Sequence, residues 1–156
     1  MDIDRQTSYG LFNFSASYIK CAEAAIIAKK NKTINYRFND PLYFLLFHAC
    51  ELVLKAYMKE KTGAFRRSHN LKELLNDCIQ MGLDLSEEDE NSIIFFNECN
   101  SEEDDDKIKT GYVFRYIKTG SRVAPELSSL LAWVISFYNK IQIHMPQQQT
   151  RKYQYA

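Results

Sequence analysis

Apolar residues recur every three or four positions along most of the chain, which is the spacing of helices that bury one face. Over residues 9–30 this pattern predicts a first helix. Its expected inner stripe is Leu11, Phe14, Tyr18, Cys21, Ala25 and Ala28. A polar connection follows, and residues 41–61 predict a second helix. Asp40 is suited to be its N-cap, Pro41 its first residue and Gly63 its stop.

Two shorter helices are expected next, because each has its own start signal. Asn70 is a good N-cap, and Glu73 stands three residues later, as in a capping box. Gly82 is placed to be the left-handed residue after this third helix. Ser86 is expected to cap the fourth helix, which ends near Asn100.

Residues 101–123 form the least regular part of the chain, and no strand pattern longer than a few residues is found in it. The acidic run from Glu102 to Asp106 predicts a solvated, mobile loop. A calcium loop is disfavoured, because the glycine and closing glutamate of an EF-hand are missing. The last helix follows Pro125, and we expect Trp133 and Phe137 to make core or dimer contacts. Its apolar stripe is Leu127, Leu130, Leu131, Val134, Tyr138 and Ile141.

These elements predict an all-α, single-domain, up-and-down bundle of about five helices. The domain is expected to span residues 1–145, and residues 146–156 a flexible polar tail. Short connections favour antiparallel neighbours.

The charge balance argues against a global electrostatic attraction to nucleic acid. The 156 residues carry 20 basic and 20 acidic side chains, so RNA would have to be bound by a local patch. The four cysteines are Cys21, Cys50, Cys78 and Cys99. They are too far apart for metal or redox motifs, so we expect buried structural thiols, no metal and no cofactor. The polar start lacks a signal peptide, and no apolar run reaches membrane length, which predicts a cytoplasmic protein without membrane contact.

The second helix combines apolar bulk with three ionisable residues. It is apolar nearly all round, which predicts a central helix or one between the bundle and a second subunit. His48, Glu51 and Lys55 lie within roughly 60° of one another at 100° per residue. They therefore form one polar seam on this helix.

A charge in a half-buried seam needs a partner. Glu51 and Lys55 form a favourable i, i+4 pair. Further candidate partners are Arg66, Arg67 and Arg115, together with His69. In one interpretation Glu51 is a structural anchor for loops. In another the seam is a pocket in which His and Arg handle phosphate and Glu51 orients them. We expect His48 to be a satisfied core or rim histidine and His144 to lie at the surface.

Three short motifs, in this order, resemble the HEPN superfamily (higher eukaryotes and prokaryotes nucleotide-binding domain). They are Glu51 with Lys55 on an apolar helix, His69-Asn70-Leu71 at the next helix start, and Arg115-Tyr116 before the last helix. The resemblance covers residues 40–145. It implies a dimeric helical bundle in prokaryotic cytoplasm that associates with RNA or nucleotides. It also implies toxin–antitoxin or phage-defence contexts, with an antitoxin or nucleotidyltransferase as partner.

The chain departs from the ribonuclease members of that family. They carry an Arg followed by His after four to six residues, and none of the seven arginines here has that relation to a histidine. The leading hypothesis is a HEPN-like dimer that binds RNA, a nucleotide or a protein partner without nuclease activity. The expected ligand-binding residues are Glu51, Lys55, Arg66, Arg67, His69, Arg115 and Tyr116. One alternative is a divergent metal-independent endoribonuclease using His69, Arg66, Arg115 and Glu51, and another is a purely structural interaction domain.

Overall fold

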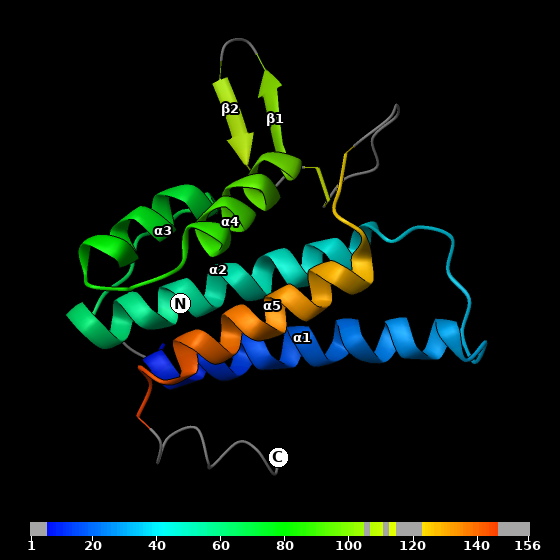
Figure 1. Ribbon diagram of the computed structural model, residues 1–156, viewed down its shortest axis with the longest axis horizontal. Helices are drawn as coiled ribbons and strands as arrows, with labels where there is room; N and C mark the ends of the chain where they lie inside the picture. The colour runs from blue at the N-terminus through cyan, green and yellow to red at the C-terminus, as the bar shows by residue number, and fades with distance from the viewer. Residues whose placement is uncertain (1–5, 105–106, 111–112, 115–122, 147–156) are drawn as a thin grey trace.

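The computed structural model describes residues 6–104, 107–110, 113–114 and 123–146. Within these ranges the chain forms five helices and one short hairpin, which confirms the all-α bundle (Figure 1). The elements are α1 (Ser8–Lys30), α2 (Asp40–Thr62), α3 (Leu71–Gln80), α4 (Glu87–Cys99), β1 (Ser101–Asp104), β2 (Lys107–Thr110) and α5 (Leu127–Gln142).

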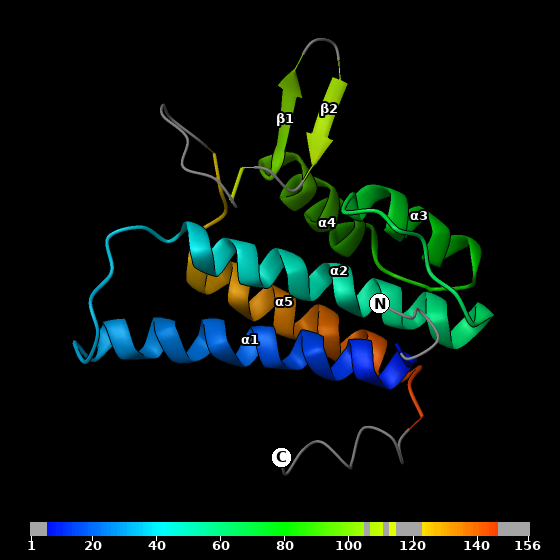
Figure 2. The same ribbon diagram turned by 180° about the vertical axis from the view of Figure 1, so that it is seen from behind.

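Helix α2 lies at the centre of the bundle. It runs antiparallel to α1, and α5 packs against both, while α3 and α4 lie on the other side of α2 (Figures 1 and 2). The Ser15 hydroxyl donates to the Ala49 carbonyl at 2.7 Å, which fixes the α1–α2 contact inside the core. The expected central position of α2 is therefore confirmed.

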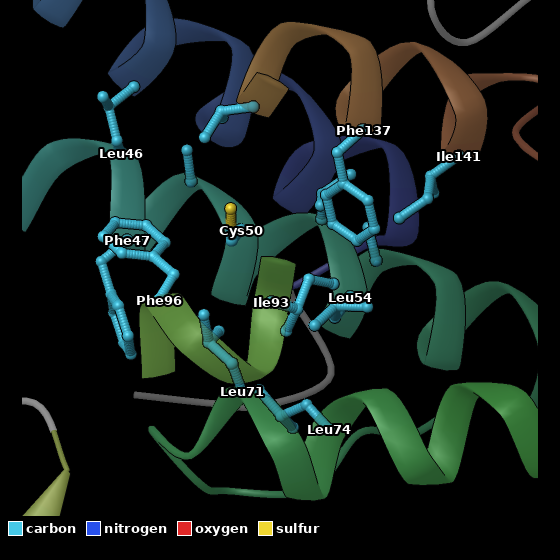
Figure 3. Close-up of a cluster of buried hydrophobic side chains, with 14 of the residues drawn as sticks. Leu46, Phe47, Cys50, Leu54, Leu71, Leu74, Ile93, Phe96, Phe137 and Ile141 are labelled. Atoms are coloured by element: carbon cyan, nitrogen blue, oxygen red, sulfur yellow. The ribbon is translucent and has the colours of Figure 1, made fainter. Parts of the chain in front are cut away.

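The core is built from side chains on both sides of α2. Figure 3 shows residues of α3, α4 and α5 converging on this helix. The labelled residues include Leu46, Phe47, Cys50, Leu54, Leu71, Leu74, Ile93, Phe96, Phe137 and Ile141, and each is at most 2% exposed. Burial on all sides explains why α2 is apolar nearly all round.

Helix α2 is also long and apolar enough, by length and composition, to cross a membrane. In this structure 67% of the relevant segment is buried within the bundle. The core helix of a soluble protein passes the same test, so the apolar character of α2 has a sufficient explanation in its packing.

The inner face of α1 differs from the predicted stripe. The buried residues are Ser8, Leu11, Phe12, Ser15, Ile19 and Ala22. Phe14, by contrast, is 65% exposed, and Cys21 is exposed as well. The prediction that all four cysteines are buried is therefore wrong for Cys21, and Cys99 is only partly buried. Both stripes of α1 have helical spacing, and contact with α2 and α5 selects one of them.

Most helix ends follow the predicted chemistry. Asn70 and Ser86 accept backbone N–H groups as N-caps, and Gly63 and Gly82 have positive φ at helix ends. The expected cap of α2 is wrong, because Asp40 is already helical. Asn39 occupies the cap position and makes no side-chain cap bond. Pro at the start pre-organises φ and needs no N–H partner, so the helix begins without that bond.

The acidic run is not a loop over its first residues. Ser101–Asp104 pairs antiparallel with Lys107–Thr110, and the register sets Glu102 opposite Lys109 and Asp104 opposite Lys107. The sequence puts acidic residues in β1 and lysines in β2, and opposite charge at two of the paired positions favours this pairing. Residues 105 and 106 lie outside the described residues.

A second buried carboxylate links α4 to α5. Asp89 is 4% exposed, accepts a bond from the Trp133 indole Nε1 at 3.3 Å and pairs with Lys140. Burial opposes ionisation of Asp89, yet bonds from Lys140, Ser86 and Trp133 outweigh it and lower its pKa. Trp133 also stacks on the buried Phe137, so the predicted core role of both aromatics is confirmed.

Candidate functional site

The predicted polar seam of α2 is a charge cluster centred on Glu51. The residue is 3% exposed, and Lys55 Nζ donates to its Oε1 at 2.6 Å. His69 Nδ1 lies 3.0 Å from the same oxygen, and His48 Nδ1 lies 3.5 Å from Oε2. One buried carboxylate is thus contacted by three nitrogen-bearing side chains, two from α2 and one from the loop before α3.

The cluster keeps Glu51 ionised although it is buried. Burial raises its pKa, but the hydrogen bond and charge of His48, together with those of Lys55, outweigh burial and lower the pKa to about 2. Lys55 itself is 7% exposed, and its ammonium also lies 5.6 Å from the Phe65 ring centroid. A buried ion pair of this kind is sensitive to loss of either partner, because the remaining charge stays desolvated.

The contact between Glu51 and His69 decides how the imidazole is oriented. An ionised carboxylate only accepts hydrogen bonds, so His69 Nδ1 must carry the hydrogen. Its Nε2 is then the ring nitrogen left for another partner, on a side chain that is 60% exposed. Carboxylates that hold Nδ1 in this way are used to orient histidines for proton transfer through Nε2.

The loop that carries His69 is fixed by a network next to the α3 start. The Asn70 side chain accepts the N–H groups of Lys72 and Glu73, and Asn97 Nδ2 donates to it from α4. Asn97 Oδ1 in turn accepts the Leu71 N–H at 2.8 Å. The buried Asn97 was not found by sequence reasoning, because its role depends on a contact between helices far apart in sequence.

In the capping box at α3, Ser68 lies between Glu73 and the backbone N–H of Asn70. Glu73 accepts a bond from the Ser68 hydroxyl, and Ser68 Oγ accepts the Asn70 N–H. The predicted return contact of Glu73 therefore runs through Ser68. This arrangement holds the residues on both sides of His69 in place.

His48 is packed rather than free, as expected of a rim histidine. Its ring contacts Tyr18 of α1 edge-on at 4.8 Å and stacks on Phe44 at 5.9 Å, between ring centroids. The prediction for His144 is wrong in part, because this residue is half-buried and contacts the Tyr57 ring edge-on.

Arg66 and Arg67 do not join Glu51 as predicted. Arg66 Nε and Nη2 donate to the two carboxylate oxygens of Asp77 at 2.7 and 3.1 Å, so this guanidinium is directed to α3. Glu73 lies 3.9 Å from it. A bidentate pair with a near carboxylate explains why Arg66 does not reach the seam. Arg67 is exposed, two residues from His69.

Arg115 and Tyr116, the third predicted motif, lie outside the described residues. Of the predicted site residues that the structure describes, it brings together Glu51, Lys55 and His69. Over the described ranges, no group of three or more His, Cys, Asp or Glu is arranged to hold a metal ion. The ammonium of Lys55 occupies one side of the Glu51 carboxylate, which is unfavourable for a metal ligand.

Comparison with known proteins identifies no relative. No protein-family model matches the chain, and neither a curated protein nor a solved structure shows significant similarity to it.

Proposed function

We propose that this chain is a HEPN-like helical domain that binds the phosphate groups of RNA or of a nucleotide at the surface formed by His69 and Arg67. The observation that carries the proposal is the contact of His69 Nδ1 with the buried, ionised Glu51. This contact fixes the ring and leaves Nε2 on an exposed side chain, where the imidazolium form, with both nitrogens protonated, donates a hydrogen bond. The exposed Arg67 supplies a second donor suited to phosphate oxygens.

Two other cations of the region are engaged. Lys55 is buried against Glu51, and Arg66 is held by Asp77. We therefore assign phosphate binding by this surface to His69 and Arg67. Neutral overall charge is compatible with such a local site, although it gives no long-range attraction.

Binding is tested by titrating the protein with labelled RNA and, separately, with a nucleoside triphosphate at low salt. We expect His69→Ala and Arg67→Ala to weaken binding about tenfold each, as the loss of a hydrogen bond to a charged group does. Lys72→Ala is the matched control, since Lys72 is an exposed cation at the start of α3. If neither RNA nor nucleotide binds, and neither raises the melting temperature, the purely structural interaction domain is favoured.

A metal-independent endoribonuclease is the second candidate, favoured by the same Glu51–His69 contact. A histidine whose Nδ1 is held by a carboxylate can exchange a proton through Nε2, as cleavage next to a 2′-hydroxyl requires. RNA is incubated with the protein in EDTA. Cleavage by wild type and by Lys72→Ala, but not by His69→Ala, would establish this activity.

We further propose that the chain is a homodimer formed through the outer face of α1. Phe14, Ser17, Cys21 and Ala24 are exposed on this face, and the partly buried Ala28 continues it. They lie within about 80° of one another at 100° per residue. A helix that is apolar on two opposite faces is expected to be covered on both.

The order of side chains on this face favours an antiparallel copy. In a two-fold pair centred at Cys21, the large Phe14 of one copy meets the small Ala28 of the other. A parallel pair would oppose Phe14 to Phe14 and leave Ala28 facing Ala28.

Oxidation tests this arrangement. Copper-phenanthroline with dissolved oxygen should join two Cys21 thiols into one disulfide and give a dimer on a non-reducing gel. Cys99→Ser should not prevent the crosslink, and Cys21→Ser should abolish it. Phe14→Asp should yield a folded monomer by light scattering, and a wild-type monomer at all concentrations would contradict the proposal.

A further inference from the structure

The connection between α1 and α2 carries a local excess of positive charge. Lys29, Lys30, Lys32 and Arg37 lie in or beside residues 31–39, and no acidic residue occurs between Glu23 and Asp40. The rest of the chain must therefore carry a net negative formal charge, since the total is zero. This segment is distinct from the His69 surface and takes no part in the Glu51 cluster.

The backbone of this connection holds a lysine in a left-handed conformation. Helix α1 ends with Lys32 N–H bound to the Lys29 carbonyl at 3.0 Å and Thr33 N–H bound to the Ala28 carbonyl at 2.9 Å. This is a Schellman ending, whose left-handed position is usually a glycine. Lys32 has φ 60° there, the one positive φ of a residue other than glycine in the described part of the chain. The left-handed backbone costs a side-chain-bearing residue roughly 1 kcal/mol.

Two cations of the segment lie over aromatic rings. Lys29 Nζ is 4.2 Å from the centroid of Tyr36, and Arg37 Cζ is 5.5 Å from the centroid of Phe38. Phe38 is nevertheless 66% exposed, and Ile34 is 46% exposed. An exposed ring beside cations is the combination that a stacking platform for bases uses.

The aromatic character continues along α2. Phe44 and His48 are stacked, partly exposed and spaced as neighbours on the helix face that also carries Glu51. From Asp40 to Glu51 the helix rises about 16 Å. Two partly exposed rings, Phe44 and His48, thus lie on α2 between its start and Glu51.

We propose that residues 29–38 bind single-stranded nucleic acid, with a base stacked on Phe38 and with Arg37 and Lys32 at the phosphates. Stacking platforms combined with cations are how single strands are bound without sequence readout, since every base has a π-face and every linkage a charge. The inference rests on the proposed RNA association and assigns it a second contact surface. A membrane is a less suitable ligand, because the exposed apolar side chains of the segment are only Ile34 and Phe38 and no amphipathic helix presents them.

The test is fluorescence anisotropy of labelled oligo(U) and oligo(dT) with the full chain over a range of salt. Phe38→Ala should weaken binding about tenfold, which is within the range for loss of one stacked base. Phe95→Ala is the matched control, because Phe95 is an exposed phenylalanine on α4. Arg37→Ala should reduce the slope of log affinity against log salt by about one.

Lys32→Gly separates binding from folding. It relieves the left-handed backbone and should raise the melting temperature, while it removes a phosphate contact and should weaken oligonucleotide binding. A variant that is more stable but binds less well cannot owe its weaker binding to unfolding. Unchanged affinity in Lys32→Gly and Phe38→Ala would overturn the inference.

The outcomes also distinguish this inference from the proposed function. If wild type binds RNA and only His69→Ala and Arg67→Ala are impaired, the segment is not a binding surface and the proposed function stands. If only the Phe38 and Lys32 variants are impaired, the His69 surface is refuted as the site. If wild type binds neither oligonucleotide, both fail. Loss of binding to anionic phosphatidylserine vesicles in Phe38→Ala, without an effect on oligonucleotides, would assign the segment to membranes instead.

Discussion

His69 Nδ1 lies 3.0 Å from Oε1 of Glu51, although the two residues are 18 positions apart and belong to different elements. The same oxygen accepts the Lys55 ammonium at 2.6 Å. This oxygen of Glu51 therefore has two roles, since it neutralises the buried ammonium of Lys55 and orients the exposed imidazole of His69. The stability and the candidate chemistry of the protein are coupled at this carboxylate.

The Glu51–Lys55 pair should behave as a buried ion pair. Glu51→Gln is expected to lower the free energy of unfolding by roughly 3 kcal/mol, because Lys55 would remain desolvated without a counter-ion. Adding Lys55→Met should restore part of that loss, because no buried charge is left. Urea unfolding of both single variants and the double variant measures the coupling. Strictly additive losses would contradict the pairing.

Acid should weaken the fold through Glu51. Folding lowers its pKa from 4.5 to about 2, so the folded state holds the proton less readily than the unfolded state. The resulting stabilisation is complete above pH 4.5 and is lost as the pH falls toward 2. Its size is about 3 kcal/mol. Between about pH 6 and about pH 3, wild type should lose more unfolding free energy than Glu51→Gln. Parallel pH profiles would show that Glu51 is not the titrating group.

Asn70 should matter more than an ordinary helix cap. Its Oδ1 accepts two backbone N–H groups of α3 and also Asn97 Nδ2, whereas Ser86 accepts the Asp89 N–H. We expect Asn70→Ala to cost about 2 kcal/mol and Ser86→Ala about 1 kcal/mol. Urea midpoints of the two variants make the comparison. Equal losses would mean that the bond from Asn97 contributes nothing.

The thiols should differ in reactivity. Cys21 is exposed, whereas Cys50 and Cys78 are buried. Burial raises the thiol pKa of Cys50, and burial together with nearby Asp77 raises that of Cys78 to about 12. Ellman's reagent should therefore label Cys21 rapidly in native dilute protein, Cys99 more slowly, and the other two only after unfolding.

Cys21→Ser is the control for this experiment and should remove the fast phase. The rate at Cys21 should also fall as protein concentration rises, because the proposed dimer covers the outer face of α1. Rapid native labelling of Cys50 or Cys78 would contradict the core described above.

Local signals in the sequence determined where most elements begin and end. Asn70, Ser86, Gly63 and Gly82 act through hydrogen bonds and backbone angles within a few residues, so their effects can be read without the fold. The Glu51–Lys55 pair is equally local, because one helical turn brings the two side chains together. The apolar circumference of α2 likewise predicted a central place or one at a subunit interface, and the structure has the central one.

Tertiary structure alone decided the rest. Helix α1 has two apolar stripes of helical spacing, and packing on α2 selected the one with Phe12 rather than Phe14. The Arg66 guanidinium lies near two carboxylates, and it pairs with both oxygens of Asp77 rather than with the more distant Glu73. His69 reached Glu51 because the loop before α3 folds back along α2. Such contacts depend on distances between elements, and those are set by packing of the whole core rather than by any local pattern.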